Sequence, residues 1–169
     1  MQKSYYPSDR ARYYFTALLQ QSPTACAKIS GGDDYPSING DVRFYQTPSG
    51  TLIAAQVFGL PNIEEPCRSQ IFAFHIHEGT SCSGVAFADT LGHYNPKGCE
   101  HPYHAGDLPP LFSNNGYAFS AFLTDRFSVA EVVGKTVVIH RGVDDFTSQP
   151  AGNAGEKIAC GRIERRPCY

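Results

Sequence analysis

Short segments of alternating apolar and polar residues, separated by turn residues, constrain the fold of this chain most strongly. Alternation with a period of two places successive side chains on opposite faces of an extended strand. The segments expected to be strands are 24–30, 41–46, 51–60, 69–77, 116–124, 135–141 and 157–163. Glycine, proline, asparagine and aspartate between them supply the turns. This pattern predicts an antiparallel β-sandwich or β-barrel.

Composition limits the possible partners and compartments. The 169 residues suffice for one domain with a sizeable core, and the net charge of −2 gives no basic footprint for nucleic acid. No window approaches the ~20 apolar residues of a membrane span. The polar first twelve residues lack a secretory signal, so a cytoplasmic location is expected. Six cysteines are many for a reducing cytosol and leave an extracellular or cell-surface location open.

The domain organisation expected from the sequence is simple. Residues 1–23 are interpreted as an N-terminal tail with a short helix over 11–21, and residues 24–169 as one β-barrel domain. The helix could cover one end of the sheet or bind a partner. Residues 78–115 lose all periodicity, and an unpatterned segment of this length is usually functional or cross-linked.

All six histidines lie between residues 75 and 140, which favours a shared metal site over scattered surface positions. His75 and His77 fall on the same face of the strand over 69–77, although a polar outer face would also explain them. The unpatterned loop continues with His93, His101 and His104, and Asp107 follows after two more residues. A surface loop rich in histidine is the alternative.

The ligand types indicate which metals these residues could bind. Three imidazoles and one carboxylate, at His93, His101, His104 and Asp107, suit four-coordinate zinc. His75, His77 and His140 all fall at strand positions. Three or four imidazoles without a sulfur ligand suit Cu(II).

Several motifs carry a resemblance to a known family. They are Phe-His-Ile-His-Glu at 74–78, Gly-His-Tyr-Asn-Pro at 92–96, His-Ala-Gly-Asp-Leu at 104–108, Val-Val-Ile-His at 137–140, Gly-Asn-Ala-Gly at 152–155 and Ala-Cys-Gly at 159–161. In this order they resemble the copper/zinc superoxide dismutases, over about residues 25 to 163. The resemblance implies an all-β fold, an eight-stranded Greek-key β-barrel (an immunoglobulin-like sandwich) with two long loops that carry the metal site.

The resemblance also implies the ligand sets and the activity. His75, His77, His93 and His140 would bind copper, and His93, His101, His104 and Asp107 would bind zinc, so that His93 bridges the two metals. The implied activity is disproportionation of superoxide to dioxygen and hydrogen peroxide, by alternate reduction and oxidation of a copper ion beside a structural zinc. His93 would supply one of the protons.

Four further residues take roles from the resemblance. Asp144 matches a carboxylate that links a copper-ligand and a zinc-ligand imidazole, and Cys82 and Cys160 match the family disulfide. Lys157 stands where the family has an arginine beside the open copper face, and the loop after Asp145 is short. Six cysteines allow about 15 pairings, and Cys26, Cys67, Cys99 and Cys168 are left unassigned.

Two other functions remain open at this point. A copper- and zinc-holding barrel could buffer or deliver metal with little turnover, and a structural coat or adhesion barrel could have inherited its histidines. The complete ligand set favours the enzyme. Superoxide is then the expected partner, and assembly into a homo-oligomer is left open.

Overall fold

A computed structural model describes residues 16, 19–62, 70–165 and 168. The expected N-terminal helix over 11–21 falls largely outside these residues. No helix in the part of the chain that the structure describes is both long and apolar enough to cross a lipid bilayer.

The fold is an antiparallel β-barrel, as the strand pattern predicts. Seven strands form one curled sheet in the order β5-β8-β9-β1-β2-β3-β7, and a second sheet pairs β4 with β6. The first sheet comprises β1 (Ala25–Gly31), β2 (Asn39–Thr47), β3 (Gly50–Phe58), β5 (Phe74–His77), β7 (Ala118–Thr124), β8 (Thr136–His140) and β9 (Lys157–Glu164). The short strands are β4 (Ile71–Phe72) and β6 (Leu111–Phe112).

The inner faces of the strands meet in one apolar core. Phe44 of β2, Ile53 of β3, Phe74 of β5 and Ile139 of β8 are fully buried in the same cluster. Each large side chain buried in this way contributes about 1.5–3 kcal/mol. Because β5 buries Phe74 and Ile76 in this core, His75 and His77 face the opposite side.

The structure differs from the expected elements in two segments. The strand expected over 69–77 is divided into β4 and β5, because Ala73 pairs with Gly142 and His140 through backbone hydrogen bonds. The loop expected over 78–115 contains a 3₁₀ segment, η1 (Val85–Thr90), and the two-residue strand β6. Both elements are too short to produce a periodic signal. Between β7 and β8 the chain forms one short helix, α2 (Val129–Val132).

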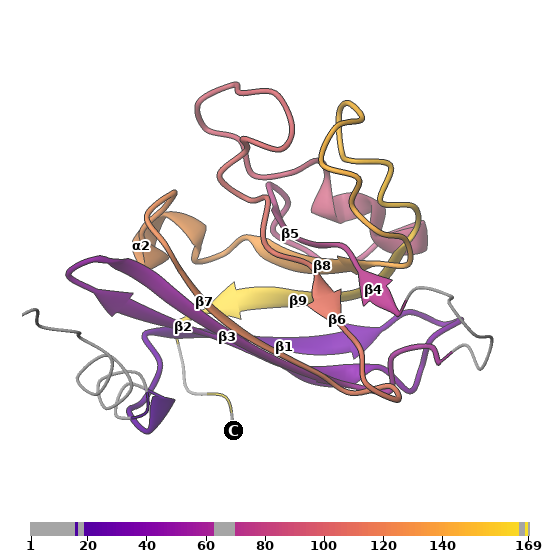
Figure 1. Ribbon diagram of the computed structural model, residues 1–169, viewed down its shortest axis with the longest axis horizontal. Coiled ribbons are helices and arrows are strands. Elements are labelled where there is room, and N and C mark those ends of the chain that lie inside the picture. The colour runs from indigo at the N-terminus through magenta and orange to yellow at the C-terminus, as the bar shows by residue number, and fades with distance from the viewer. Residues whose placement is uncertain (1–15, 17–18, 63–69, 166–167, 169) are drawn as a thin grey trace, which may run out of the picture.

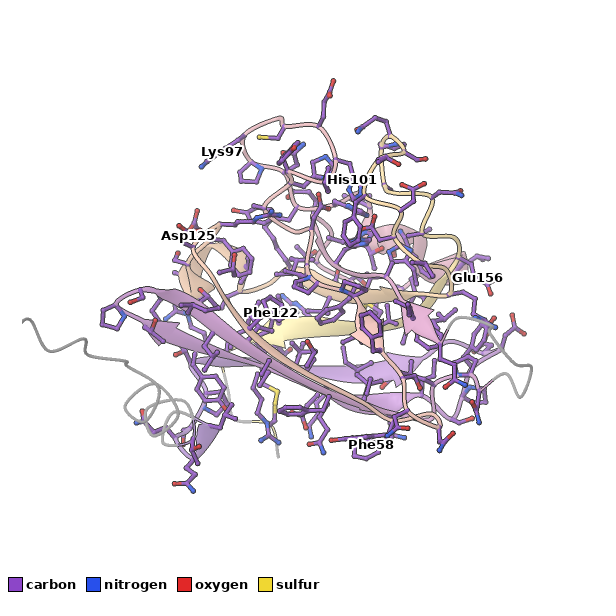
Figure 2. All side chains as sticks on the ribbon, viewed as in Figure 1. Phe58, Lys97, His101, Phe122, Asp125 and Glu156 are labelled. Atoms are coloured by element: carbon purple, nitrogen blue, oxygen red, sulfur yellow. A yellow bond between two sulfur atoms is a disulfide. The ribbon has the colours of Figure 1, made fainter. Side chains whose placement is uncertain are left out.

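Two long loops rise from the same side of the sheet. Figure 1 shows the loop between β5 and β6 next to the loop between β8 and β9, while β1, β2 and β3 run along the opposite wall. His101 lies at the top of the molecule, between these loops, and Phe58 lies on the far side of the sheet (Figure 2). The fold thus brings two segments that are distant in sequence over the β5–β8 strand pair.

Candidate metal centre

Strand β5 is the element on which the site is built. On one edge it pairs with β8, and on the other it forms isolated bridges from His77 to His93 and from His75 to Asp107. The loop residues therefore extend the sheet over the face that carries the two strand histidines. His75 and His77 are 0% and 2% exposed, so the alternative of a polar outer face is wrong.

The first cluster brings together imidazoles from three segments. Its members are His75, His77, His93 and His140, and all four are buried. One candidate ligand atom from each lies within 4.8 Å of the others. A β-bulge between Ile139 and His140 sits opposite β9, and bulges often re-aim side chains beside functional sites.

Hydrogen bonds occupy one ring nitrogen of each strand histidine in the first cluster. His75 Nε2 lies 2.8 Å from Asp144 Oδ2, and His77 Nδ1 lies 2.9 Å from the Leu91 carbonyl oxygen. His75 Nδ1 is buried and has no hydrogen-bond partner among the described residues. Such partners fix the tautomer and the ring orientation of a histidine ligand.

His140 completes this arrangement from β8. Its Nδ1 lies 3.1 Å from the Gly155 carbonyl oxygen, and its Nε2 lies 3.2 Å from His77 Nε2. Two basic nitrogens that face each other at this distance are well suited to share a cation. The first cluster therefore offers metal-ligating nitrogens from three segments of the chain. The other ring nitrogen of each strand histidine is held by a hydrogen bond.

The second cluster is centred on the carboxylate of Asp107. Its Oδ1 lies 2.7 Å from His93 Nδ1, and its Oδ2 lies 3.1 Å from His101 Nδ1 and 3.3 Å from His104 Nδ1. All four residues are buried, which rules out the alternative of a histidine-rich surface loop. Buried His101 Nδ1 has no hydrogen-bond partner among the residues that the structure describes, despite its proximity to the carboxylate. Three imidazoles and one carboxylate fit a zinc ion.

His93 belongs to both clusters. Its Nδ1 faces Asp107 in the second cluster, whereas its Nε2 is buried and has no hydrogen-bond partner in the described part of the chain. The His93 ring lies 4.0 Å from the His75 ring, between centroids. A single imidazole can serve two cations in this way only if each ring nitrogen faces one of them.

Asp144 connects the two clusters, because its carboxylate contacts one histidine of each. Its carboxylate oxygens lie 2.8 Å from His75 Nε2 and 2.9 Å from His101 Nε2, and the residue is 2% exposed. Burial raises the pKa of Asp144, but hydrogen bonds from His75, Phe146 and His101 outweigh it and lower the pKa to about 2. A permanent carboxylate therefore orients one histidine of each cluster. Asp145 is exposed and binds only its own turn.

Burial also favours the neutral form of the imidazoles, which is the form that binds metal. It lowers the pKa of His77 to about 2 and that of His140 to about 3, and it lowers the pKa of His75 as well. Neutral imidazole is the form that binds metal, so no proton has to be displaced near neutral pH.

Lys157 reaches the loop that precedes His93. Its ammonium donates hydrogen bonds to Thr90 Oγ1 at 2.7 Å and to the Leu91 carbonyl oxygen at 3.0 Å, and it lies 3.5 Å from the Phe87 carbonyl oxygen. Burial lowers its pKa. The same Leu91 oxygen accepts from His77, so Lys157 and a candidate copper ligand share one anchor.

Leu91 holds that anchor in an uncommon backbone conformation. Its φ of 60° and ψ of −147° lie in a region that is populated almost only by glycine. Its side chain is 61% exposed, so burial of the side chain does not explain the conformation. The strain is consistent with a carbonyl oxygen that must meet two donors.

The disulfides tie the site loop and the C-terminal segment to the sheet. One joins Cys82 to Cys160 on β9, and a second joins Cys26 on β1 to Cys168. Cys99 is a free thiol. Cys67 lies outside the described residues.

Arg126 is a contributor that sequence reasoning missed. Its Nη1 donates to the carbonyl oxygens of Pro102, His104 and Asp107 at 3.1–3.2 Å. These contacts hold the loop that carries the second cluster against the β7–α2 turn. An arginine in a turn gives no signal of such contacts, because its acceptors are backbone groups.

The chain is similar in sequence to known proteins. A family model described as copper/zinc superoxide dismutase matches residues 38–163. "Superoxide dismutase [Cu-Zn] 2" of Aquifex aeolicus is 37% identical over 139 residues, which cover 73% of this chain and 78% of the relative. The Legionella pneumophila superoxide dismutase [Cu-Zn] is 34% identical, with 76% and 80% covered. The extracellular superoxide dismutase [Cu-Zn] of Rattus norvegicus is 34% identical, with 75% and 55% covered.

Proposed function

Because the chain belongs to the copper/zinc superoxide dismutase family, we propose that its two histidine clusters hold one copper ion and one zinc ion. The copper ligands are His75, His77, His93 and His140, and the zinc ligands are His93, His101, His104 and Asp107. The observation that carries this assignment is a set of buried ring nitrogens that have no hydrogen-bond partner among the described residues, at His75 Nδ1, His93 Nε2 and His101 Nδ1.

The enzyme disproportionates superoxide to dioxygen and hydrogen peroxide, with copper and zinc as cofactors. Bound copper supplies the one-electron chemistry, and zinc is redox-silent. His93 is assigned two tasks: it would join the two metal sites through its two ring nitrogens, and Nε2 would carry a proton for peroxide whenever that nitrogen does not bind copper. That nitrogen is buried, and no described residue competes for it through a hydrogen bond, which supports the second task. Asp144 fixes the orientations of the His75 and His101 rings relative to each other through its two hydrogen bonds.

Superoxide consumption by the metal-loaded protein tests this function. Protein loaded with equimolar copper and zinc is expected to bind one ion of each per chain and to consume superoxide rapidly, whereas the metal-free protein does not. Elemental analysis and pulsed generation of superoxide measure both quantities. Stoichiometric metal with negligible consumption would instead favour metal buffering or delivery, which no observation favours at present.

Lys157 is proposed to guide superoxide towards the copper site. Lysine offers one flexible point charge where an arginine would offer a rigid fork, so it attracts the anion but orients it less well. The three loop contacts of its ammonium group hold this charge next to Leu91, whose carbonyl oxygen also meets His77. Lys157 therefore contributes both attraction and loop position.

Charge reversal at this position is expected to slow the enzyme. Lys157→Glu should lower the second-order rate at least about tenfold, which corresponds to about 1.4 kcal/mol, with the metal content unchanged. The residual rate should rise with added salt, because salt then screens a repulsion. Pulsed generation of superoxide across a range of ionic strength measures both effects. Lys157→Arg should match or exceed the parent rate.

Lys28→Glu is the matched control for this experiment. Lys28 is exposed on β1, at the wall opposite the two loops, and the substitution changes the net charge equally. Its rate should stay close to that of the parent. A Lys157→Glu enzyme with the parental rate and salt dependence would show that Lys157 does not guide superoxide.

The remaining expectations concern the setting of the enzyme. We infer an oxidising compartment, the alternative to the cytoplasm that the cysteine content left open, because two disulfides join described residues. One relative is named as an extracellular enzyme, which agrees with this inference. Residues 24–169 are proposed as the metal-binding barrel domain. A homo-oligomer stays a prediction.

A further inference from the structure

The Gln149 side chain pairs with the backbone of a single residue, His101. Gln149 Nε2 donates to the His101 carbonyl oxygen at 2.7 Å, and Gln149 Oε1 accepts from the His101 backbone N–H at 3.0 Å. A side-chain amide presents one donor and one acceptor side by side, so it can close this two-bond ring. The two residues are 48 positions apart in the chain.

The turn that presents Gln149 is fixed by its own hydrogen bonds. The Asp145 carboxylate accepts from the backbone N–H groups of Thr147 and Ser148 and from the Ser148 hydroxyl, at 2.6–2.9 Å. The Ser148 carbonyl oxygen accepts from the Gly152 N–H at 2.7 Å. Gln149 therefore extends from an ordered turn, which lowers the entropic cost of holding its amide in one place.

The same loop also forms a hydrogen bond with the ring of His101. Asp144 Oδ1 lies 2.9 Å from His101 Nε2, so the residue is held through its ring and through its backbone at once. Gly152 packs so closely on this contact that an added Cβ would lie 2.0 Å from Asp144 Oδ1 and 2.6 Å from His101 Nε2. With both ends held, His101 Nδ1 is directed towards Asp107 Oδ2, 3.1 Å away.

We propose that Gln149 is a positioning residue for the zinc site, which fixes the backbone of His101 so that its Nδ1 meets the ion. This inference rests on the proposed function, because it takes His101 as a zinc ligand. In the described part of the chain, the hydrogen bonds of the four candidate copper ligands go to groups other than Gln149. The two hydrogen bonds between Gln149 and the His101 backbone, here called the clamp, thus act on the zinc site. They leave the three strand histidines of the copper site undisturbed.

The test compares metal affinities in Gln149→Ala, Gln149→Glu and the parent enzyme. Loss of the clamp should weaken zinc about tenfold, within the range found for groups that orient metal ligands, and should leave the copper affinity within about twofold. Gln149→Glu keeps an acceptor for the His101 N–H but loses the donor, so it should weaken zinc as well. Competition with a chelator measures both affinities. The visible spectrum of Co(II) in the zinc site should change in both variants.

Gln21→Ala is the matched control, because Gln21 is exposed and lies far from both loops in sequence. It should bind both metals as the parent does. Parental zinc affinity and Co(II) spectra in both Gln149 variants would overturn the clamp, and so would an equal loss of zinc and copper, which would indicate general destabilisation. A parent protein that binds no zinc would overturn the proposed function itself, and the inference with it.

Discussion

Replacing His93 with alanine is expected to separate the two metal sites and to lower the rate of superoxide consumption at least about 100-fold, or about 2.7 kcal/mol. His93 is the one residue that both ligand clusters contain. Its Nδ1 lies 2.7 Å from Asp107 Oδ1, and its Nε2 faces the first cluster with no hydrogen-bond partner among the described residues. The substitution removes a ligand from each metal and the proposed proton carrier.

The separation should be visible without an activity assay. Copper would keep His75, His77 and His140, and zinc would keep His101, His104 and Asp107, so both ions should still bind, though more weakly. In the parent, adding zinc should change the Cu(II) spectrum, because both ions contact one imidazole. In His93→Ala this response should disappear. A Cu(II) spectrum that is identical in parent and variant would refute the bridge.

His104→Ala is the appropriate comparison for His93→Ala. All six histidines of the chain lie in the two clusters, so no neutral histidine is available. His104 belongs only to the second cluster, where its Nδ1 lies 3.3 Å from Asp107 Oδ2. Its loss should weaken zinc but leave all four proposed copper ligands in place. The Cu(II) spectrum should therefore still respond to zinc at concentrations that fill the weakened site.

Removing the Cys82–Cys160 disulfide is expected to lower the free energy of unfolding by about 4 kcal/mol. The bridge closes a sequence separation of 78 residues, and its Cα atoms lie 5.7 Å apart. Cys160 is buried on β9, where it pairs with Ser30 of β1 and Val138 of β8. The bridge therefore ties the loop before His93 to the middle of the sheet, and the unfolded chain loses freedom when it is closed.

Denaturant unfolding of the Cys82→Ser/Cys160→Ser protein measures this loss, and metal affinity provides a second readout. Both should fall, because the disulfide loop connects His77 to His93. The matched control is Cys26→Ser/Cys168→Ser, which opens a bridge with a separation of 142. That control should lose stability but keep its metal affinity, since Cys26 lies on β1, outside the site loops. An unfolding free energy within about 1 kcal/mol of the parent for the first variant would contradict the prediction.

Local patterns in the sequence were sufficient to predict most strands and to single out the histidines that the structure brings together. The run Thr136–His140 is buried at every position, and β3 alternates core side chains such as Ile53 and Val57 with residues of the outer face. Such patterns are local, because burial selects the side chain at each position of a strand. Clustering of all six histidines likewise indicated metal before any fold was known.

Contacts between distant segments could be decided only by the tertiary structure. The Cys26–Cys168 pairing, the contact from Arg126 to the loop of the second cluster and the hydrogen bonds of Lys157 to Thr90 all join residues more than twenty positions apart. The ammonium group of Lys157 meets a hydroxyl and backbone carbonyl oxygens, and the residue type alone gives no indication of these partners.

The physical reason is that backbone groups are the same at every position. Most partners of these side chains, such as the carbonyl oxygens at Leu91 and His104 or both backbone groups of His101, carry no sequence signature. Residue types therefore determined which atoms could bind metal. The path of the two loops over β5 decided which side chains hold those atoms in place.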